Sequence, residues 1–554
     1  MSAAGNSLRH SKLFSFETGF FLILIVAFVL RFAFLDLKLF HHDEAIHAWF
    51  SYQLLTQGTY TYDPSYHGPL LYFVTASMFS LFGASDLVGR LVPALLGFLM
   101  VPMVYAIYRL GYLNKAQTLV AGLFVAISPD LVYFSRFLRH DIFMLFFSFL
   151  LLVALLYYFE RGKTRYFLLA AFALGGGLCC KEEMPLIALI FGSFFLFSVW
   201  RGRFTLPRQW KWDVVLGVLV VVGIMAVLYS SFGAQPEVLV GQNFNISTSG
   251  WYKAIDHWME MHNECRLCGP FYYYLPLFLL YELPIMILAV IGTIQFIGKE
   301  TSVKEYLSKI WDRIHPPSVG AGITTMTDGI PQIEESSLVR ETPPPSQEIE
   351  TESKQTEFFA FSIYWMVLSM GMYAYIGEKV PWLIIPQLLP MIFVAVYAMS
   401  RKKAFFAIAS IAFLAMMTWH VAFVPVDINE PIVQVQNSEQ LRDVMAQIDA
   451  ADHVAVASDS YWPLPWYYRG EASKKLVYYA RRVDENTLLS QDFDLVIAHD
   501  TDSYASLPGF TKKTYHLNYW FDYYNNENRL PEYYVTREGP MGSMNIDVFT
   551  RAAA

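Results

Sequence analysis

Residues 17–44 read ETGFFLILIVAFVLRFAFLDLKLFHHDE, an apolar run that ends in two adjacent carboxylates, Asp43 and Glu44. A transmembrane helix needs roughly 20 mostly apolar residues, and this run is long enough. Carboxylates at a membrane boundary are poorly compensated unless they hold a metal ion, a cationic group or a substrate proton. The stretch therefore predicts a membrane protein with a polar site at the end of its first span.

The composition supports the same class of protein. Hydrophobic residues make up 55% of the 554 residues and charged residues only 16%, and the mean hydropathy is +0.35. These values exclude an ordinary soluble enzyme and indicate a polytopic membrane protein. No nucleic-acid partner is implied. Four cysteines are too few for a disulfide scaffold, so we expect stability to come mainly from helix packing.

Eleven apolar windows of suitable length follow one another along the chain. They lie at 17–35, 88–108, 117–129, 142–159, 166–180, 184–200, 213–232, 274–297, 358–376, 383–399 and 404–424. The third and fifth windows are short, which favours little tilt or a partly re-entrant path. The predicted fold class is a polytopic α-helical membrane protein with about 11 transmembrane helices.

Lys and Arg gather in the loops on one side of these windows. The residues concerned are Arg9, Lys12, Arg109, Lys115, Arg161, Lys163, Arg165, Arg201, Arg203, Arg208, Lys211, Arg401, Lys402 and Lys403. Short loops rich in Lys and Arg stay cytoplasmic. Residues 1–16 are therefore predicted to be cytoplasmic, residues 17–424 to form the membrane domain, and the carboxyl-terminal region to lie outside.

The first external loop, residues 36–87, is predicted to contain two interfacial helices. Apolar residues at helical spacing indicate a helix over 43–57, and Gly58 provides a stop. Residues 69–83 are apolar but only about 15 long, and counting them as a span would invert every later loop and break the charge rule. We therefore place them in the membrane interface as well.

Two further regions differ from the apolar windows. Residues 301–357 are rich in Pro, Ser, Thr and Glu, which predicts a disordered cytoplasmic loop. After Pro425 the hydropathy falls, and an amphipathic helix near residues 437–448 precedes strand-like runs. These runs lie at 454–458, 476–479, 495–499 and 544–549. The pattern indicates a small external α/β domain over 425–554.

Asp43 and Glu44 allow two interpretations. One is a helix cap with a solvated neighbour, because acidic residues are common at helix starts. The other is a general base with a metal or acceptor ligand beside it. Glycosyl transfer to a hydroxyl needs a carboxylate that accepts the acceptor proton, and it needs positive charge to stabilise a departing phosphate.

Cationic residues occur at the predicted outer ends of three windows. Arg136 and Arg139 are three residues apart and suit a lipid phosphate, although headgroup anchoring is the alternative. Asp141 is either a further site residue or a structural partner of these arginines. Lys181 next to Glu182, and Lys379 next to Glu378, are either paired with a neighbouring carboxylate or aimed at an anion.

One loop carries residue types that bind zinc. His257, His262, Cys265 and Cys268 lie together, and Cys-x-x-Cys with upstream histidines is compatible with a zinc site. Because the loop is predicted to be external, a local disulfide or two free thiols is the alternative.

The order of these motifs resembles the GT-C membrane glycosyltransferases, and protein O-mannosyltransferases and the aminoarabinose lipid A transferase are the most similar by pattern. The motifs are Asp43-Glu44, His67-Gly68-Pro69-Leu70, Leu81-Phe82-Gly83, Gly89-Arg90-Leu91-Val92-Pro93, Ser135-Arg136 with Asp141, Lys181, and Lys379-Val380-Pro381-Trp382. Within the superfamily, 42–44 and 378–383 most resemble a prokaryotic flippase-activity-associated group with an RgtA/B/C/D-like domain.

The resemblance implies inverting transfer of a sugar from a polyprenyl-phosphate donor to an acceptor protein, lipid or glycan, at the outer face of a prokaryotic cell membrane. It implies that Asp43 is the general base, that Glu44 contacts acceptor or metal, and that Asp141 is the second acidic residue. A divalent metal ion is the one cofactor that this implies. The competing hypotheses are a lipid-linked oligosaccharide flippase and a non-catalytic flippase-associated partner.

The resemblance further implies which cations bind the donor. The phosphate-binding residues are Arg136, Lys181 and Lys379, to which our own interpretation adds Arg139. Supporting roles are assigned to His42, Glu182 and Glu378.

Overall fold

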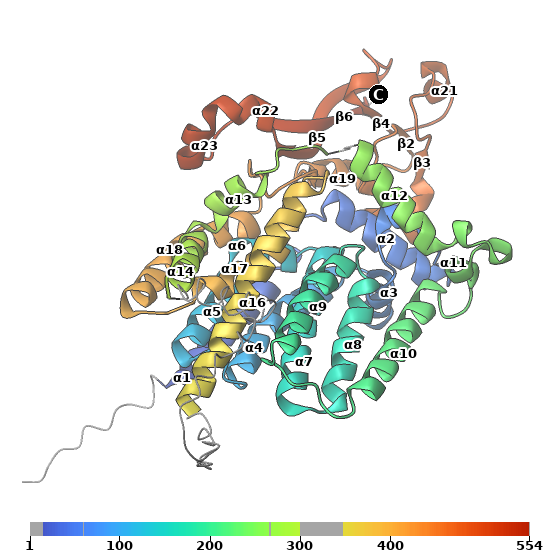
Figure 1. Cartoon of the computed structure of the whole chain (residues 1–554). Helices are drawn as coiled ribbons and strands as arrows, with labels where there is room; N and C mark the ends of the chain where they lie inside the picture. Colours follow the sequence, from blue (N-terminus) through green and yellow to red (C-terminus); the bar gives the residue numbers. More distant parts are fainter. Residues whose placement is uncertain (1–14, 59, 265–266, 300–346, 553–554) are drawn as a thin grey trace, which may run out of the picture.

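The computed structural model describes residues 15–552 except residue 59, 265–266 and 300–346. A helical membrane part carries a sheet domain at one end, and the short helices between them include α12 (Gly250–Glu264) (Figure 1). The predicted division into apolar helices and a carboxyl-terminal sheet is confirmed in outline.

Within the described residues, five helices are long and apolar enough to cross a membrane. They are α4 (Asp86–Tyr108), α7 (His140–Arg161), α10 (Trp210–Tyr229), α16 (Gln347–Tyr375) and α18 (Arg401–Phe423). Two bent pairs raise the number to at most seven: α5 (Lys115–Ile127) with α6 (Pro129–Ser135), and α13 (Tyr274–Tyr281) with α14 (Leu283–Lys299). The chain is thus a multi-pass membrane protein, but the count of eleven spans is not confirmed.

The remaining predicted windows form shorter helices. They are α1 (Phe16–Phe32), α8 (Thr164–Leu178), α9 (Met184–Trp200) and α17 (Ile385–Ala395), the last preceded by the 3-10 turn Pro381–Ile384. Every residue of α17 is buried against other parts of the protein. Its apolar residues therefore pack against protein, and hydropathy alone does not distinguish such a helix from one that contacts lipid.

The two bent pairs break at positions that contact each other. Ser128 ends α5 and caps α6, and the two helices meet at 53°. The break between α13 and α14 falls at Glu282, with a bend of 110° where one continuous window was predicted. The Glu282 carboxylate accepts hydrogen bonds from the Ser128 hydroxyl at 2.5 Å and the Asp130 backbone N–H at 3.1 Å. The buried Glu282 side chain, at the break between α13 and α14, thereby satisfies polar groups at the break between α5 and α6.

The first loop contains α2 (His42–Gln57) and α3 (Leu70–Phe82), which pack against each other. Helices were predicted at both places. Gly58 ends α2 in the left-handed conformation, with φ of 72°, as its sequence position indicates.

The predicted disordered loop over 301–357 needs correction at its end, because α16 begins at Gln347. Lys354 of this segment pairs with Glu160 at 2.8 Å, and Glu357 accepts a hydrogen bond from Ser198 at 2.5 Å. Polar contacts with neighbouring helices thus extend α16 beyond its apolar part. Residues 301–346 lie outside the described residues.

The carboxyl-terminal domain is built on a six-stranded mixed sheet in the order β1-β5-β6-β4-β2-β3. The strands are β1 (Gln436–Asn437), β2 (Val454–Ala457), β3 (Leu476–Tyr478), β4 (Leu495–His499), β5 (Phe510–Phe521) and β6 (Met541–Arg551). Strand β2 pairs in parallel with β3 and β4, and the other pairings are antiparallel. Helix α19 (Leu441–Ala450) buries Leu441, Val444 and Ile448 against the sheet. The longest strand, β5, was not predicted, because its first half is exposed and carries Lys512 and Lys513.

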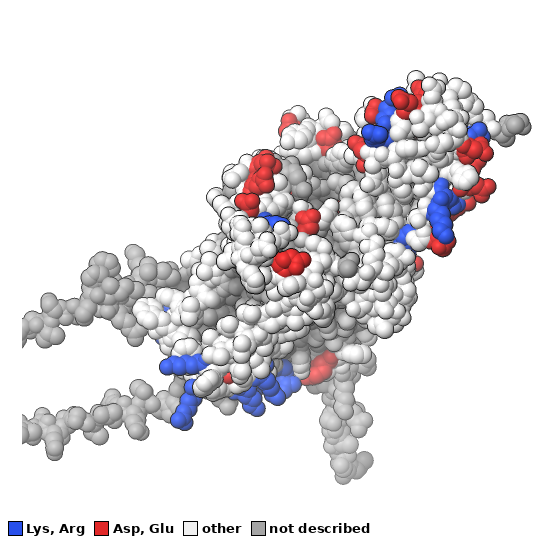
Figure 2. Space-filling model, turned by 90° about the vertical axis from the view of Figure 1, so that its right-hand side faces the viewer, with Lys and Arg blue, Asp and Glu red and all other residues white. Residues whose placement is uncertain are grey.

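Basic side chains gather at the end of the membrane part that lies away from the sheet domain (Figure 2). The turn between α7 and α8, which carries Lys163, lies at this end in Figure 1. This is the distribution that short cytoplasmic loops have in membrane proteins.

Candidate active site

A cavity of about 360 Å³ lies where α2, α12 and the loops at the ends of α8 and α16 meet. It is lined by His41, His42, Asp43, Ile46, His47, Ser65, Tyr66, His67, Arg139, Lys181, Glu183, Trp258, Leu267, Glu378, Val380, Trp382, Leu383, Gln434 and Val435. Of the predicted site residues, the structure thus brings Asp43, Arg139, Lys181, His42 and Glu378 to one cavity.

Asp43 is the second residue of α2, where the helix dipole favours a carboxylate. Its carboxylate forms an ion pair with the guanidinium of Arg139, and its side chain is 29% exposed. Arg139 precedes the first turn of α7, and its guanidinium lies 3.5 Å from the centre of the Trp382 ring. This stacking fixes the plane of the guanidinium at the cavity wall.

Asp141 is buried outside the cavity lining and binds both of the cavity's cations. One carboxylate oxygen accepts from Arg139 Nε at 3.0 Å, and the other accepts from Lys181 Nζ at 2.6 Å. Lys181 also pairs with Glu183 at 3.0 Å. These ion pairs form a chain of alternating charge with the buried Asp141 at its centre. Its members are Asp43, Arg139, Asp141, Lys181 and Glu183.

The electrostatics keep both cations charged near neutral pH. Burial opposes the ammonium of Lys181, but Asp141 and Glu183 outweigh it and raise the Lys181 pKa above its ordinary value. Burial lowers the pKa of Arg139, a group that remains protonated in proteins, and burial raises the pKa of Glu183. The cavity thus offers two fixed positive charges, which are held by the carboxylates Asp43, Asp141 and Glu183.

Two histidines of the cavity, His42 and His47, are neutral at pH 7. Burial lowers the pKa of His42 to about 4, and burial with the nearby His67 lowers that of His47 to about 3. His47 Nδ1 lies 2.8 Å from the hydroxyl of Tyr72, which donates to the Tyr66 carbonyl at 2.8 Å. The His47 nitrogen is therefore the donor in the first of these bonds.

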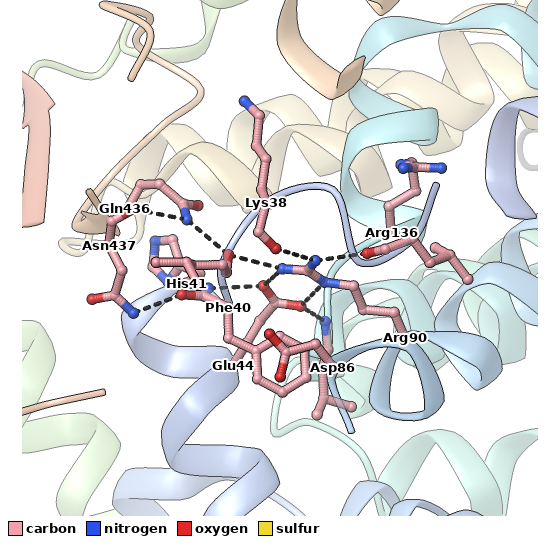
Figure 3. Close-up of polar contacts among 12 residues, drawn as sticks. Lys38, Phe40, His41, Glu44, Asp86, Arg90, Arg136, Gln436 and Asn437 are labelled. Carbon is pink, nitrogen blue, oxygen red and sulfur yellow. Dashed lines mark hydrogen bonds and ion pairs between the residues drawn. The ribbon is translucent and has the colours of Figure 1, made fainter. Parts of the chain in front are cut away.

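Glu44 does not line the cavity, which corrects the expectation that it contacts acceptor or metal. It is fully buried, and its oxygens accept from His41 N at 2.9 Å, Leu138 N at 2.7 Å, and Arg90 Nε and Nη2 at 2.8 and 2.5 Å (Figure 3). His41 and Glu44 form a capping box at the start of α2. The spacing of three residues between His41 and Glu44 is the sequence pattern that could have indicated this capping role.

Arg136 also lies away from the cavity. Its guanidinium donates to carbonyl oxygens at the end of α1, those of Leu30, Arg31, Ala33 and Phe34, at 2.7 to 3.3 Å. It therefore satisfies backbone groups that have no partner within the helix. This position replaces the predicted phosphate contact with a helix-capping one.

Lys379 likewise caps the carboxyl-terminal end of α16 with its side chain. Its ammonium donates to the carbonyls of Tyr373 at 2.8 Å, Ala374 at 2.9 Å and Ile376, and it does not line the cavity. Burial lowers its pKa. The neighbouring Glu378 lines the cavity, as Val380 and Trp382 do, whereas Glu182 lies outside it and binds His67 at 2.8 Å.

The predicted zinc ligands do not form a metal site in the described residues. Cys268 is disulfide-bonded, so its sulfur is not a thiolate ligand and the disulfide alternative holds for it. Cys265 and the side chain of His262 lie outside the described residues. His257 packs against the Trp258 ring at 5.1 Å, and no group of three His, Cys, Asp or Glu side chains suited to a metal ion occurs in the part described.

Several cavity residues were not predicted. Trp258 stacks on His67, with ring centres 5.2 Å apart, and Gln434 comes from the segment that leads into the sheet domain. Trp258 lies 215 residues after Asp43 in the chain, and Gln434 lies 391 residues after it. No local sequence pattern carries that information.

Comparison with known proteins gives the family context. A family model described as Dolichyl-phosphate-mannose-protein mannosyltransferase matches residues 66–229. ArnT from Cupriavidus metallidurans bound to undecaprenyl phosphate has a TM-score of 0.54 and 15% identity, covering 90% of this chain and 95% of that chain. The Archaeoglobus fulgidus oligosaccharyltransferase with a tethered acceptor peptide has a TM-score of 0.48 and 12% identity, covering 85% and 64%. No curated protein sequence matches the chain.

The match to ArnT shows the shared fold, and it extends over both the membrane part and the sheet domain. The family model adds a sequence match over α3 to α10, which includes Arg139, Asp141 and Lys181. The chain thus shares its fold with ArnT and matches the mannosyltransferase family model over residues 66–229.

Proposed function

We propose that the protein transfers a sugar from a polyprenyl-phosphate-linked donor to an acceptor at the outer face of the membrane, with inversion and with Asp43 as the general base. The observation that carries the proposal is the ion pair of Asp43 with Arg139 at a cavity that Lys181 also lines. Undecaprenyl phosphate bound to ArnT, which has the same fold, supports a lipid phosphate as ligand.

The donor phosphate would bind between Arg139 and Lys181. Both side chains are held by Asp141, so their positions are set before the donor arrives. A phosphate that takes Arg139 competes with the Asp43 carboxylate for the same guanidinium. Donor binding therefore frees Asp43 to accept a proton.

The chemical step is then a single displacement. The acceptor oxygen forms a bond to the anomeric carbon as Asp43 takes its proton, and the bond from that carbon to the phosphate oxygen breaks. The electron pair leaves with the polyprenyl phosphate, whose added charge Arg139 and Lys181 stabilise. Attack from the side opposite the leaving group inverts the anomeric centre.

The aromatic side chains of the cavity suit the sugar. Tyr66, Trp258 and Trp382 line it together with the charged groups. Aromatic rings provide apolar contact to the faces of a sugar ring, whereas its hydroxyls need the polar groups nearby. Sugar and acceptor identity would follow from the shape of this cavity.

The experiment is transfer in liposomes, with purified protein, radiolabelled polyprenyl-phosphate sugar and a panel of protein, lipid and glycan acceptors. We expect Asp43→Asn, which keeps the size of the side chain, to lower the rate by about 10²- to 10⁴-fold, the usual contribution of a general base. Equal release of polyprenyl phosphate by wild type and Asp43→Asn would exclude this mechanism. Lipid scrambling that persists in Asp43→Asn without transfer would favour a flippase instead.

A further inference from the structure

We infer that the sheet domain positions Asp43, because it holds residues 37–41, the segment that leads into α2. This inference rests on the proposed function for its kinetic test. The domain supplies side chains and hydrogen bonds to this segment from positions about 400 residues further along the chain. Leu39, Phe40, Gln436, Asn437 and Glu439 do not line the cavity, so they act on the reaction through the position of α2.

The side chains of two consecutive residues point into different parts of the molecule. Leu39 is 3% exposed and belongs to the hydrophobic core of the sheet domain, in one cluster with Leu441 and Val444. Phe40 is fully buried in the cluster that contains the membrane helices, where its ring lies 4.9 Å from the Arg90 guanidinium and 5.4 Å from the ring of Trp466, a residue of the carboxyl-terminal domain. The segment therefore cannot slide along its length without removing one of the two side chains from its site.

The sheet domain also binds the backbone of this segment (Figure 3). Its contacts are Glu439 Oε1 with Leu39 N at 3.0 Å, Gln436 Nε2 with Leu39 O at 3.2 Å, Tyr467 Oη with Phe40 N at 2.9 Å, and Asn437 Nδ2 with Phe40 O at 2.6 Å. The N–H and C=O groups of both Leu39 and Phe40 thus have partners in the domain. His41 Nε2 makes a further contact with the Gln434 carbonyl.

The membrane part holds the same segment from the opposite side. Arg90 of α4 donates to the carbonyls of Lys38 at 2.9 Å and Leu39 at 3.2 Å, and its remaining bonds go to Glu44 and Leu35. The amide of Asn437, at the start of the predicted amphipathic helix, donates to the Phe40 carbonyl. The segment is therefore enclosed between Arg90 and the sheet domain.

A displacement of this segment reaches Asp43 directly. His41 caps α2 and Asp43 is the second residue of that helix, so the first turn moves with the residues before it. Reaction rates are sensitive to such shifts, and a displacement of about 1 Å can cost about 10²-fold. The domain thus fixes the distance between the general base and the donor.

A purely stabilising role of the domain is the alternative, and two leucines of one cluster separate it from positioning. Leu39 and Leu441 are both buried in the core of the sheet domain, but Leu39 belongs to the segment before α2 and Leu441 to α19. Truncating either one removes the same atoms from the same core. Only Leu39→Ala also loosens the attachment of the segment.

The test compares Leu39→Ala with Leu441→Ala in the full chain. Both variants should lose thermal stability to a similar extent. We expect kcat to fall about 10- to 100-fold in Leu39→Ala with KM for the donor changed less than about threefold, and kcat to change less than about threefold in Leu441→Ala. Leu39→Met should restore kcat. Equal losses of kcat in the two alanine variants, or an unchanged kcat in Leu39→Ala, would overturn the inference.

A second measurement does not depend on activity. Hydrogen exchange of the backbone amides in residues 37–44 should be faster in Leu39→Ala and in Asn437→Ala than in Leu441→Ala. If wild type shows no transfer, the proposed function fails, while this exchange pattern still decides whether the domain holds the segment. Identical exchange in all three variants would contradict the positioning role.

Discussion

Asp43 and Glu44 are neighbours in sequence, yet only Asp43 reaches the cavity. Successive residues of a helix are about 100° apart around its axis, so two adjacent carboxylates cannot share one environment. Which one faces the cavity is decided by Arg90, which lies 46 residues after Glu44. The motif predicted the place of the site, whereas the roles of its two carboxylates required the long-range contact.

The cations of the predicted phosphate site divide in the same way. Arg139 and Lys181 reach the cavity, and Arg136 and Lys379 cap helices with their side chains. Arg136, Lys181 and Lys379 follow the carboxyl-terminal ends of helices, where a basic residue suits either role, whereas Arg139 directly precedes α7. Sequence spacing could not separate the two.

Two arginine variants test this division. Arg139→Lys keeps the charge but loses the planar group that joins Asp43, Asp141 and Trp382, so we expect KM for the donor to rise and kcat to fall, together by at least about tenfold in kcat/KM. Arg136→Lys is the matched control, and it should lower thermal stability without changing KM for the donor. A rise in KM in Arg136→Lys alone would restore Arg136 to the donor site.

The neutral histidines predict a pH dependence of stability. The pKa of His42 is about 4 in the folded protein and 6.5 ordinarily, so the unfolded chain binds a proton more readily between these values. Neutral His42 therefore does not reduce the free energy of unfolding above pH 6.5. Below pH 6.5 the free energy of unfolding falls as the pH drops towards 4, with a slope of at most ~1.4 kcal/mol per pH unit from this residue. His42→Gln should flatten the decline of Tm between pH 6.5 and 4, and Ser65→Ala, at the same cavity, should not.

At the scale of elements, the sequence predicted helices better than it predicted their surroundings. The helices α2 and α3 lie where helical spacing and a glycine stop place them. Hydropathy could not separate lipid-facing helices from α17, whose apolar residues are all buried in protein. Nor could it reveal the break at Glu282, because the polar groups that this residue satisfies belong to another helix.

The start of α2 gives the prediction at this scale. Glu44→Gln replaces a carboxylate that accepts two bonds from Arg90, and leaving a buried guanidinium unpaired typically costs about 3–5 kcal/mol. We therefore expect a clear fall in Tm, measured by intrinsic tryptophan fluorescence. Asp43→Asn, at the partly exposed neighbour, should change Tm little. A Glu44→Gln variant as stable as wild type but inactive would instead favour a direct catalytic role for Glu44.

At the scale of the whole molecule, the sheet domain and the basic loops lie at opposite ends (Figure 2). The predicted orientation places the sheet domain outside and the basic loops in the cytoplasm. The cavity is lined in part by Gln434 and Val435, which lead into the sheet domain. The reaction should therefore take place on the side of the membrane where the sheet domain lies.

Labelling with a membrane-impermeant thiol reagent measures this orientation. Ser473→Cys, exposed in the sheet domain, should react from outside intact cells, and Lys163→Cys, exposed between α7 and α8, should react only after permeabilisation. The natural chain gives the background, since Cys179 and Cys180 are buried. The reverse pattern would place the reaction on the cytoplasmic side and refute the proposed topology.

The attachment of Phe40 to Asn437, 397 residues later, has a consequence for biosynthesis. Chains are made and inserted from the amino terminus, so the helix that carries Asp43 is synthesised long before the sheet domain. During that interval the carbonyls of Leu39 and Phe40 lack their later partners. Nascent and truncated chains should therefore be inactive, and transfer of sugar would begin only when translation and export of the last domain are complete.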